Sequence, residues 1–353
     1  MRTSFVLLAS VVAFAGCRPE FTSVEEACQP SAPGSSNASE NALTAVTRGN
    51  CYRRLAGQAA ARVDVDFANA SRAHARYVDR NGVLGTESTG GQENPANLGF
   101  TGEWPWDRLN AQGYDAVDQN DGSVMYWTLA IPSVGTVSNE VDVWMDHWLT
   151  RQVLLQPGVM DSGYGRSGIM SVYENVSEFP SNDRVDNPFV YPADGQSGLP
   201  TSIVNGFASE IIASPSVVGY PITITVSSAT LGSDSFDRNP YGLVLLDQQV
   251  LDPANNRVDV IELQPEASDL PLPFTVALIP REPLQPNTEY RVFARVSWVD
   301  GIKNVETTFT TGAEGVMVDD DGEMDEEAAR VAAYQAGLSI QRSVVSRPPN
   351  LAQ

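Results

Sequence analysis

The spacing of apolar positions divides this 353-residue chain into two regions with different periodicity. In the first region, residues 41–184, apolar side chains recur at helical spacing in four stretches, at residues 42–57, 67–82, 105–114 and 138–155. In the second region, residues 185–312, apolar and polar side chains alternate in short runs separated by Pro- and Gly-containing turns. The sequence therefore predicts an α+β protein in which an all-β domain follows a domain that contains helices.

The fourth helical stretch predicts one continuous amphipathic helix. Ser138 is the expected N-cap, because its hydroxyl can accept a hydrogen bond from a backbone amide of the first turn. The helix contains His147, one of only two histidines in the chain. A histidine in such a helix either belongs to a functional site or fills space in the core. The apolar stripe of this helix consists of Val141, Trp144, Met145, Trp148 and Leu155.

The N-terminal segment carries the pattern of an export signal. Arg2 precedes an apolar run from Phe5 to Ala15, which is too short to span a bilayer. The end of this run, Phe14 to Cys17, resembles a bacterial lipobox, which implies cleavage after residue 16 and attachment of lipid to Cys17. The protein would then contact the membrane through its lipid anchor. The alternative is a plain signal peptide with an incidental cysteine. Arg18, instead of Asp, follows Cys17, which resembles lipoproteins sorted to the outer membrane.

Residues 17–40 are predicted to form a flexible tether, because they are rich in Ser, Pro, Ala and Gly. Cys28 lies in this tether and Cys51 lies in the first predicted helix. Two remaining cysteines in an exported protein most simply pair. A disulfide between them would join the start of the mature chain to the first domain.

The charge of the chain limits the classes of partner. The formal net charge of −22 argues against nucleic acid as a partner and against electrostatic binding to anionic membranes. Part of this charge lies in residues 319–327, within a predicted acidic and largely disordered tail that spans residues 313–353. The spacing of acidic residues around Gly322 does not fit an EF-hand calcium loop.

The first region resembles the CAP superfamily, which comprises cysteine-rich secretory proteins, antigen 5 and plant pathogenesis-related proteins, and especially its bacterial branch. Four stretches carry the resemblance in order: ALTAVTRGNCYRRLAG, ANASRAHARYVDRNG, NPANLGFTGEWPWDRLNAQGY and VDVWMDHWLTRQVLLQPGVMDSGYG. The resemblance covers residues 41–176 and implies a three-layer α-β-α sandwich with a cleft on one side. The second region resembles bacterial Ig-like modules, which implies an Ig-like β-sandwich.

The resemblance also implies a cleft in which many family members bind a divalent metal through two histidines and two glutamates. Here the first histidine position falls near Thr86, and the second falls at Thr150. Residues 120–130 should contain the first glutamate within a Gly-Glu-Asn motif, but they do not, and His147 stands where the second glutamate is expected. A zinc site needs three or four protein ligands. No metal and no cofactor are therefore predicted.

Four residues remain as candidate ligand contacts in the implied cleft: His147, Glu140, Glu87 and Trp144. For His147 the favoured interpretation is nevertheless a packed or surface side chain, with the ligand contact as the alternative, and His74 in the second helical stretch is likewise expected to be packed or exposed. The aromatic residues of the first region favour a core, with a wall for an apolar or sugar ligand as the alternative.

No catalytic residues are predicted. Ser162 and Ser167 lack the Gly-x-Ser-x-Gly elbow of hydrolases, and acidic residues form carboxylate pairs by chance in so acidic a chain. The favoured function is binding of a small apolar ligand, a glycan or an envelope partner without catalysis. The alternatives are a structural or adhesive surface protein and a cell-envelope hydrolase that uses cleft carboxylates. The sequence leaves the oligomeric state open.

Overall fold

A computed structural model of the chain describes residues 21–28, 34, 37–81, 92–115, 124–133, 135–178, 187–204, 217–228, 239, 241–265, 274–313 and 339–341. It contains both helices and several sheets, so the predicted α+β class is confirmed. The first unit is built on a five-stranded sheet in the order β1-β3-β4-β2-β15. These strands are β1 (Arg62–Val63), β2 (Val124–Pro132), β3 (Val159–Ser167), β4 (Met170–Glu178) and β15 (Ser339–Gln341).

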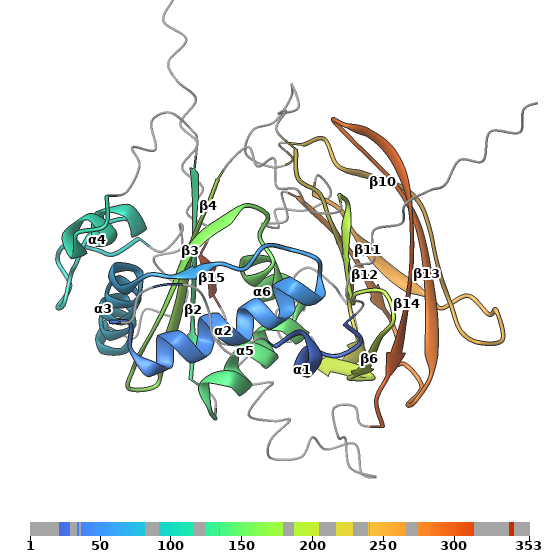
Figure 1. The fold of residues 1–353 in the computed structure, drawn as a ribbon, viewed down its shortest axis with the longest axis horizontal. Helices are drawn as coiled ribbons and strands as arrows, with labels where there is room; N and C mark the ends of the chain where they lie inside the picture. Colours follow the sequence, from blue (N-terminus) through green and yellow to red (C-terminus); the bar gives the residue numbers. More distant parts are fainter. Residues whose placement is uncertain are drawn as a thin grey trace, which may run out of the picture.

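Helices cover both faces of this sheet (Figure 1). Gly163 and Gly165 of β3 let one helix approach closely, because a Cβ at Gly165 would lie 2.1 Å from the backbone nitrogen of Arg72 in α3. The opposite face of the sheet packs on α2, where Gly49 lies close to the Tyr173 hydroxyl of β4. The helices are α1 (Val24–Ala27), α2 (Glu40–Leu55), α3 (Val65–Asn81), α4 (Pro105–Gln112), α5 (Val137–Asp146) and α6 (Trp148–Leu154). Within the described residues, none of them is long and apolar enough to cross a bilayer.

The predicted single helix over residues 138–155 is wrong, because the structure divides it into α5 and α6 at His147. The N-cap of α5 is Thr136 and not Ser138, since the Thr136 hydroxyl accepts a hydrogen bond from the Asn139 amide at 3.3 Å. The break leaves backbone carbonyls at the end of α5 without helical partners, and side chains of α6 donate to them instead. Thr150 donates to the Trp144 carbonyl at 2.5 Å.

The predicted flexible tether, residues 17–40, is partly wrong. Residues 21–28 are folded against the rest of the protein, and α1 lies within them. Ser23 caps this helix by accepting a hydrogen bond from the Glu26 amide. Cys28 and Cys51 form a disulfide, which ties α1 to α2. The part of the tether that includes Cys17 lies outside the described residues.

The second unit consists of two four-stranded sheets and a two-stranded one. The larger sheets have the orders β10-β13-β14-β6 and β11-β12-β9-β5, and β7 pairs with β8. The strands are β5 (Phe189–Tyr191), β6 (Gln196–Leu199), β7 (Ser202–Val204), β8 (Val217–Gly219), β9 (Ile222–Thr225), β10 (Val244–Leu251), β11 (Val260–Leu263), β12 (Thr275–Pro280), β13 (Glu289–Trp298) and β14 (Gly301–Thr311).

The alternation along β13 explains why these strands form a layered structure. Tyr290, Val292, Ala294 and Val296 are buried, while the intervening side chains are partly or fully exposed. Successive side chains of a strand point to opposite faces of the sheet, so one face can be apolar and the other can contact water. The buried face belongs to a core that the second unit shares with the first.

The predicted tail, residues 313–353, is not wholly without structure. Ser339–Gln341 forms β15, which pairs antiparallel with β2 at the edge of the five-stranded sheet. Residues 314–338, which include the acidic run, lie outside the described residues, as do residues 342–353.

Candidate functional site

Three of the four predicted ligand contacts are buried. Glu140 and Trp144 are 0% exposed and His147 is 1% exposed. Glu87 lies outside the described residues, as does Thr86, near which the first histidine position of the family falls. Trp144 packs with its ring centroid 6.1 Å from that of Tyr164 and 6.0 Å from that of Tyr173. In this conformation Trp144 therefore contributes to the core of the first unit.

Glu140 is held by hydrogen bonding inside the protein. The Tyr164 hydroxyl of β3 donates to Glu140 Oε2 at 2.6 Å, and the Arg166 guanidinium lies 3.7 Å from Oε1. Burial, together with the nearby Glu140 charge, raises the pKa of Tyr164 above its usual value, so the phenol stays protonated and keeps donating. The carboxylate that was expected to contact a ligand thus joins α5 to β3.

His147 is the residue at which α5 ends and α6 begins. Its Nδ1 accepts a hydrogen bond from the Leu149 amide at 3.3 Å, so His147 serves as the N-cap of α6. Burial, with the charge of Arg151 beside it, lowers the pKa of His147 to about 3. The imidazole is therefore neutral at physiological pH, with its proton on Nε2 because Nδ1 accepts.

Beside His147, a junction connects the first unit to the second. We define the junction as Asp146, Arg151, Tyr191, Tyr220 and Pro221. Arg151 donates through Nε to the Met145 carbonyl at 2.6 Å and through Nη1 to the Pro221 carbonyl at 2.8 Å. Its guanidinium also lies over the Tyr191 ring at 4.6 Å and the Tyr220 ring at 5.1 Å. One arginine of α6 thus contacts both units.

Asp146 completes the junction from the end of α5. It accepts a hydrogen bond from the Tyr220 hydroxyl at 3.1 Å. Burial raises the pKa of Asp146 to about 7, although Arg151 and the Tyr220 hydrogen bond act in the opposite direction. The segment that contains His147 is therefore part of the contact between the two units, and the side chains of Asp146 and Arg151 face protein atoms.

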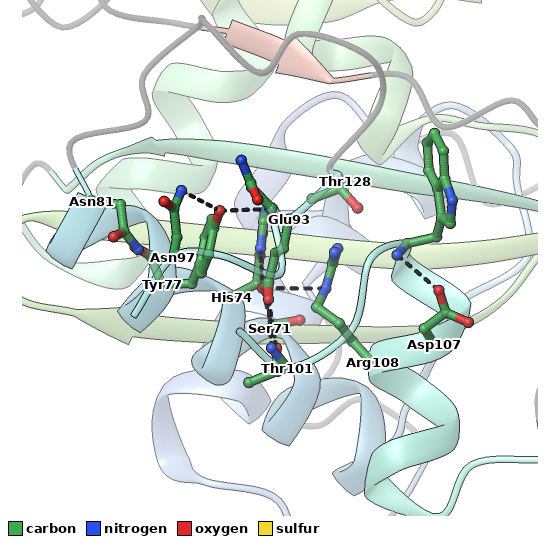
Figure 2. Close-up of polar contacts among 12 residues, drawn as sticks. Ser71, His74, Tyr77, Asn81, Glu93, Asn97, Thr101, Asp107, Arg108 and Thr128 are labelled. Atoms are coloured by element: carbon green, nitrogen blue, oxygen red, sulfur yellow. Dashed lines mark hydrogen bonds and ion pairs between the residues drawn. The ribbon is translucent and has the colours of Figure 1, made fainter. Parts of the chain in front are cut away.

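A second buried polar cluster surrounds His74, for which the sequence predicts only a packed or exposed side chain. His74 of α3 is 1% exposed, and its Nδ1 lies 2.8 Å from Glu93 Oε1 (Figure 2). Glu93 also accepts hydrogen bonds from the Thr101 amide at 2.7 Å and from the Thr101 hydroxyl. We call this cluster the His74 network and define it as His74, Glu93, Thr101, Arg108 and Glu174, with Ser71 and Thr128 at its edge.

Arg108 of α4 links the two carboxylates of the network. It donates to Glu174 Oε1 of β4 at 2.7 Å and has its Nε 4.0 Å from Glu93 Oε1. Ser71 and Thr128 also donate to Glu174, at 3.1 and 3.2 Å. The network therefore ties together α3, α4, β2, β4 and the segment that follows residue 91.

The electrostatics of the network fix the state of its histidine. Burial lowers the pKa of His74, and the Arg108 charge lowers it further, against the opposing effect of Glu93. Burial alone would raise the pKa of Glu93, but the His74 hydrogen bond and the Arg108 charge outweigh it, so that pKa is lowered. A carboxylate can only accept, so the neutral imidazole carries its proton on Nδ1. Its Nε2 is then a buried acceptor, without a hydrogen-bond partner among the described residues.

This arrangement constrains the chemistry that the network can perform. A neutral histidine oriented by a carboxylate could act as a base, but the hydroxyl of Ser71, one turn away, is engaged with the Phe67 carbonyl and with Glu174. The guanidinium of Arg108 would repel a cation at Glu93. Within the described part of the chain, no three His, Cys, Asp or Glu side chains are placed to hold a metal ion.

The sequence did contain a signal for this cluster. Glu93 is followed by Asn94, the same order as in the Glu-Asn step of the family motif, although the resemblance places that motif in residues 120–130. Those residues include most of β2 and contribute Thr128 to the network. Nothing in the local sequence, however, indicates that His74, Arg108 and Glu174 meet, because they lie on three different elements.

Comparisons with known proteins give a limited result. No family model matches the chain, and no curated protein matches it. Among solved structures, the chain is similar to an extracellular protein containing an SCP domain from Bacillus anthracis str. Ames, with 13% sequence identity and a TM-score of 0.31. The match covers 39% of this chain and 40% of that one. So partial a likeness assigns neither a family nor an activity.

Proposed function

We propose that this chain is an exported, lipid-anchored bacterial protein of the cell envelope. On this proposal it combines a CAP-like unit with an Ig-like β-sandwich, and binds a small apolar ligand, a glycan or an envelope partner without catalysis. The lipobox-like run that ends at Cys17 supports export and anchoring. Arg18 after it supports an outer-membrane destination.

The layering of the first unit supports the CAP-like assignment. Helices α3 and α4 lie on one side of the five-stranded sheet, and α2, α5 and α6 lie on the other (Figure 1). Two residues that carry the family resemblance have structural roles in this arrangement. Asn50 exchanges hydrogen bonds with the backbone of Ala61, and Arg53 donates to the carbonyls of Leu154 and Gln156.

The strand order of the second unit supports the Ig-like assignment. That fold has seven strands, A to G, which form two sheets with the orders A-B-E-D and C-F-G. When β5 and β9–β14 are counted as A to G, the observed orders β5-β9-β12-β11 and β10-β13-β14 agree with this pattern. β6 then runs parallel to the last strand and extends its sheet.

One observation carries the proposal that the protein is not an enzyme: among the described residues, the buried carboxylates of the first unit are engaged with other protein groups. Glu140 is engaged by Tyr164, Asp146 by Tyr220, and Glu93 by His74 and Thr101. A catalytic carboxylate or imidazole must reach a reacting atom of the substrate. The second candidate, a structural or adhesive role, is supported by the junction, which makes the two units pack through shared core residues.

Two experiments test this proposal. Growth with an alkyne-labelled fatty acid should label the wild-type protein and leave Cys17→Ser unlabelled and in the soluble fraction. Absence of label from the wild type would exclude the anchor. Purified residues 18–353 should release neither reducing sugar ends nor free amines from isolated cell-wall sacculi. Release of either product, lost in a His74→Gln variant, would favour the hydrolase instead.

A further inference from the structure

The start of the described chain is fixed to the β-sandwich. The Ser197 amide of β6 donates to the Thr22 carbonyl at 2.9 Å, and the Ser197 hydroxyl reaches the same carbonyl at 3.3 Å. Phe21, one residue earlier, is partly buried against the main core. The chain is therefore attached to the folded protein from residue 21 onward, and not only from the first long helix.

The same segment is also fixed to the first unit. The disulfide joins Cys28 to Cys51 of α2, and Arg48 of α2 lies 3.3 Å from Glu25. Within the segment, the Thr22 amide and hydroxyl both donate to Glu26, at 2.8 and 2.9 Å. Residues 21–28 thus contact both units. We call the surface formed by these residues and β6 the anchor end.

The number of residues between the anchor end and the proposed lipid site is small. Cys17 is four residues before Phe21, and four residues of fully extended chain span at most about 14 Å. We infer that the lipid on Cys17 holds the anchor end against the bilayer surface, so that the protein stands on its envelope membrane in one orientation. This inference rests on the proposed lipid attachment.

The orientation places the remote parts of the molecule away from the lipid. In Figure 1, α1 and β6 lie together at the anchor end, whereas α4 is at the far side of the first unit. The His74 network includes Arg108 of α4, so in this orientation α4 and its contribution to the network lie on the side remote from the anchor end (Figure 1). The β-sandwich is not held at a distance from the membrane, as a spacer would be, but lies beside it.

The anchor end faces a lipid surface. The short chain between the lipid on Cys17 and Phe21 holds it there, and no attraction between charges is needed. Glu25, Glu26 and Asp194 are exposed at or beside this surface. Acidic side chains are not attracted to anionic headgroups. We therefore expect the same orientation on zwitterionic and on anionic vesicles, with no gain in binding on the anionic ones.

The test measures the distance of two sites from the bilayer. The full chain is expressed in bacteria with a single reporter cysteine and reconstituted in vesicles that carry nitroxide on the lipid headgroups. Cys17 is lipidated and Cys28 is oxidised with Cys51, so the reporter is the free thiol for a fluorophore. Ser197→Cys reports on the anchor end and keeps the backbone hydrogen bond to Thr22. Ala111→Cys, exposed on α4, reports on the far side.

Fluorescence at position 197 should be quenched several-fold more than at position 111. Glu289→Cys, exposed at the start of β13, gives a second reporter near β6 that leaves Ser197 intact. Insertion of twenty Gly and Ser residues between Glu20 and Phe21 gives a linker of about 25 Å r.m.s. length and should reduce the difference. A persistent difference with that linker would show that surface affinity, not chain length, orients the protein.

The outcomes distinguish a failure of the proposed lipid anchor from a failure of the proposed orientation. Protein that floats with the vesicles but shows equal quenching at positions 197 and 111, or stronger quenching at 111, would overturn the orientation alone. Protein that fails to float, and whose Cys17 reacts with the dye, lacks the lipid, and this result would overturn both the anchor and the orientation.

Discussion

The two histidines of this chain occupy buried clusters that differ in how each ring is held. His74 donates from Nδ1 to the carboxylate of Glu93, within a network that also contains Arg108 and Glu174. His147 accepts at Nδ1 from a backbone amide and lies beside the charge of Arg151. The neutral rings are therefore opposite tautomers. Equal burial leads to different roles, because the partner of the ring decides which nitrogen carries the proton.

The clusters also differ in what they connect. The His74 network joins elements within the first unit, from α3 through α4 to β4. The junction joins the first unit to the second, through Arg151 and the carbonyl of Pro221. Damage to the network should therefore loosen one unit, and damage to the junction should loosen the contact between the two.

The largest effect is expected from Arg151→Met. The variant removes the donors of the Met145, Asp146 and Pro221 carbonyls, which should lower the free energy of unfolding by about 4 kcal/mol. Urea denaturation followed by tryptophan fluorescence measures this change. The control is Arg295→Met on an exposed position of β13, with an expected change within about 0.5 kcal/mol. A similar small change for Arg151→Met would refute the structural role of the junction.

A smaller loss is expected from Glu93→Gln, which breaks the His74 network. The new side-chain amide can still accept a hydrogen bond from Thr101, but the charge that balances Arg108 is lost. The free energy of unfolding should therefore fall by roughly 2 kcal/mol. The matched control is Glu103→Gln in the same segment, because the Glu103 side chain is exposed and accepts an exposed hydrogen bond from Gln92. Equal stability of the two variants would contradict the importance of the network.

The pH dependence of stability distinguishes the two neighbours at the junction, Asp146 and His147. Burial raises the pKa of folded Asp146 to about 7 from its ordinary value of 3.8, so its contribution to stability is complete below pH 3.8 and is lost as the pH rises through 7. Burial lowers the pKa of folded His147 to about 3 from its ordinary value of 6.5, so its contribution to stability is complete above pH 6.5 and is lost as the pH falls towards 3. As the pH rises from 4 to 6.5, Asp146 therefore lowers the free energy of unfolding and His147 raises it.

Single variants should reveal how each residue contributes to the pH dependence of the free energy of unfolding. Relative to the wild type, Asp146→Asn should gain stability as the pH rises from 4 to 7, by at most about 1.4 kcal/mol per pH unit. His147→Asn keeps an N-cap acceptor for α6 and should lose stability, relative to the wild type, as the pH rises from 4 to 6.5. Urea denaturation at intervals of half a pH unit measures both. Parallel profiles for all three proteins would show that neither group is shifted in the folded state.

The smallest effect concerns the start of α5, the helix that ends at the junction. Thr136→Ala should cost about 1 kcal/mol, because the Asn139 amide loses its side-chain acceptor. Ser138→Ala should change stability by less than about 0.5 kcal/mol, because Ser138 lies inside the helix. If Ser138→Ala is more destabilising than Thr136→Ala in thermal or urea unfolding, Ser138 is the N-cap, as the sequence predicted.

Local features of the fold could be predicted from the sequence because their causes are local. The helical spacing at residues 42–57, 67–82 and 105–114 predicts three helices, and the structure has α2, α3 and α4 there. The strands of the second unit follow from alternation within short runs. The division of α5 from α6 could not be predicted, because Thr150 and Arg151 satisfy the carbonyls at the break only when the chain bends there.

The sequence by itself determined the α+β class, the positions of α2, α3 and α4, and the resemblance to exported proteins, since periodicity and short motifs act over neighbouring residues. Tertiary structure decided the rest. It brought His74, Arg108 and Glu174 from three elements into one network, and it placed His147 and Arg151 between the two units. The physical reason is that burial and partner charge control the state of a titratable side chain, and both depend on residues that are distant in the sequence.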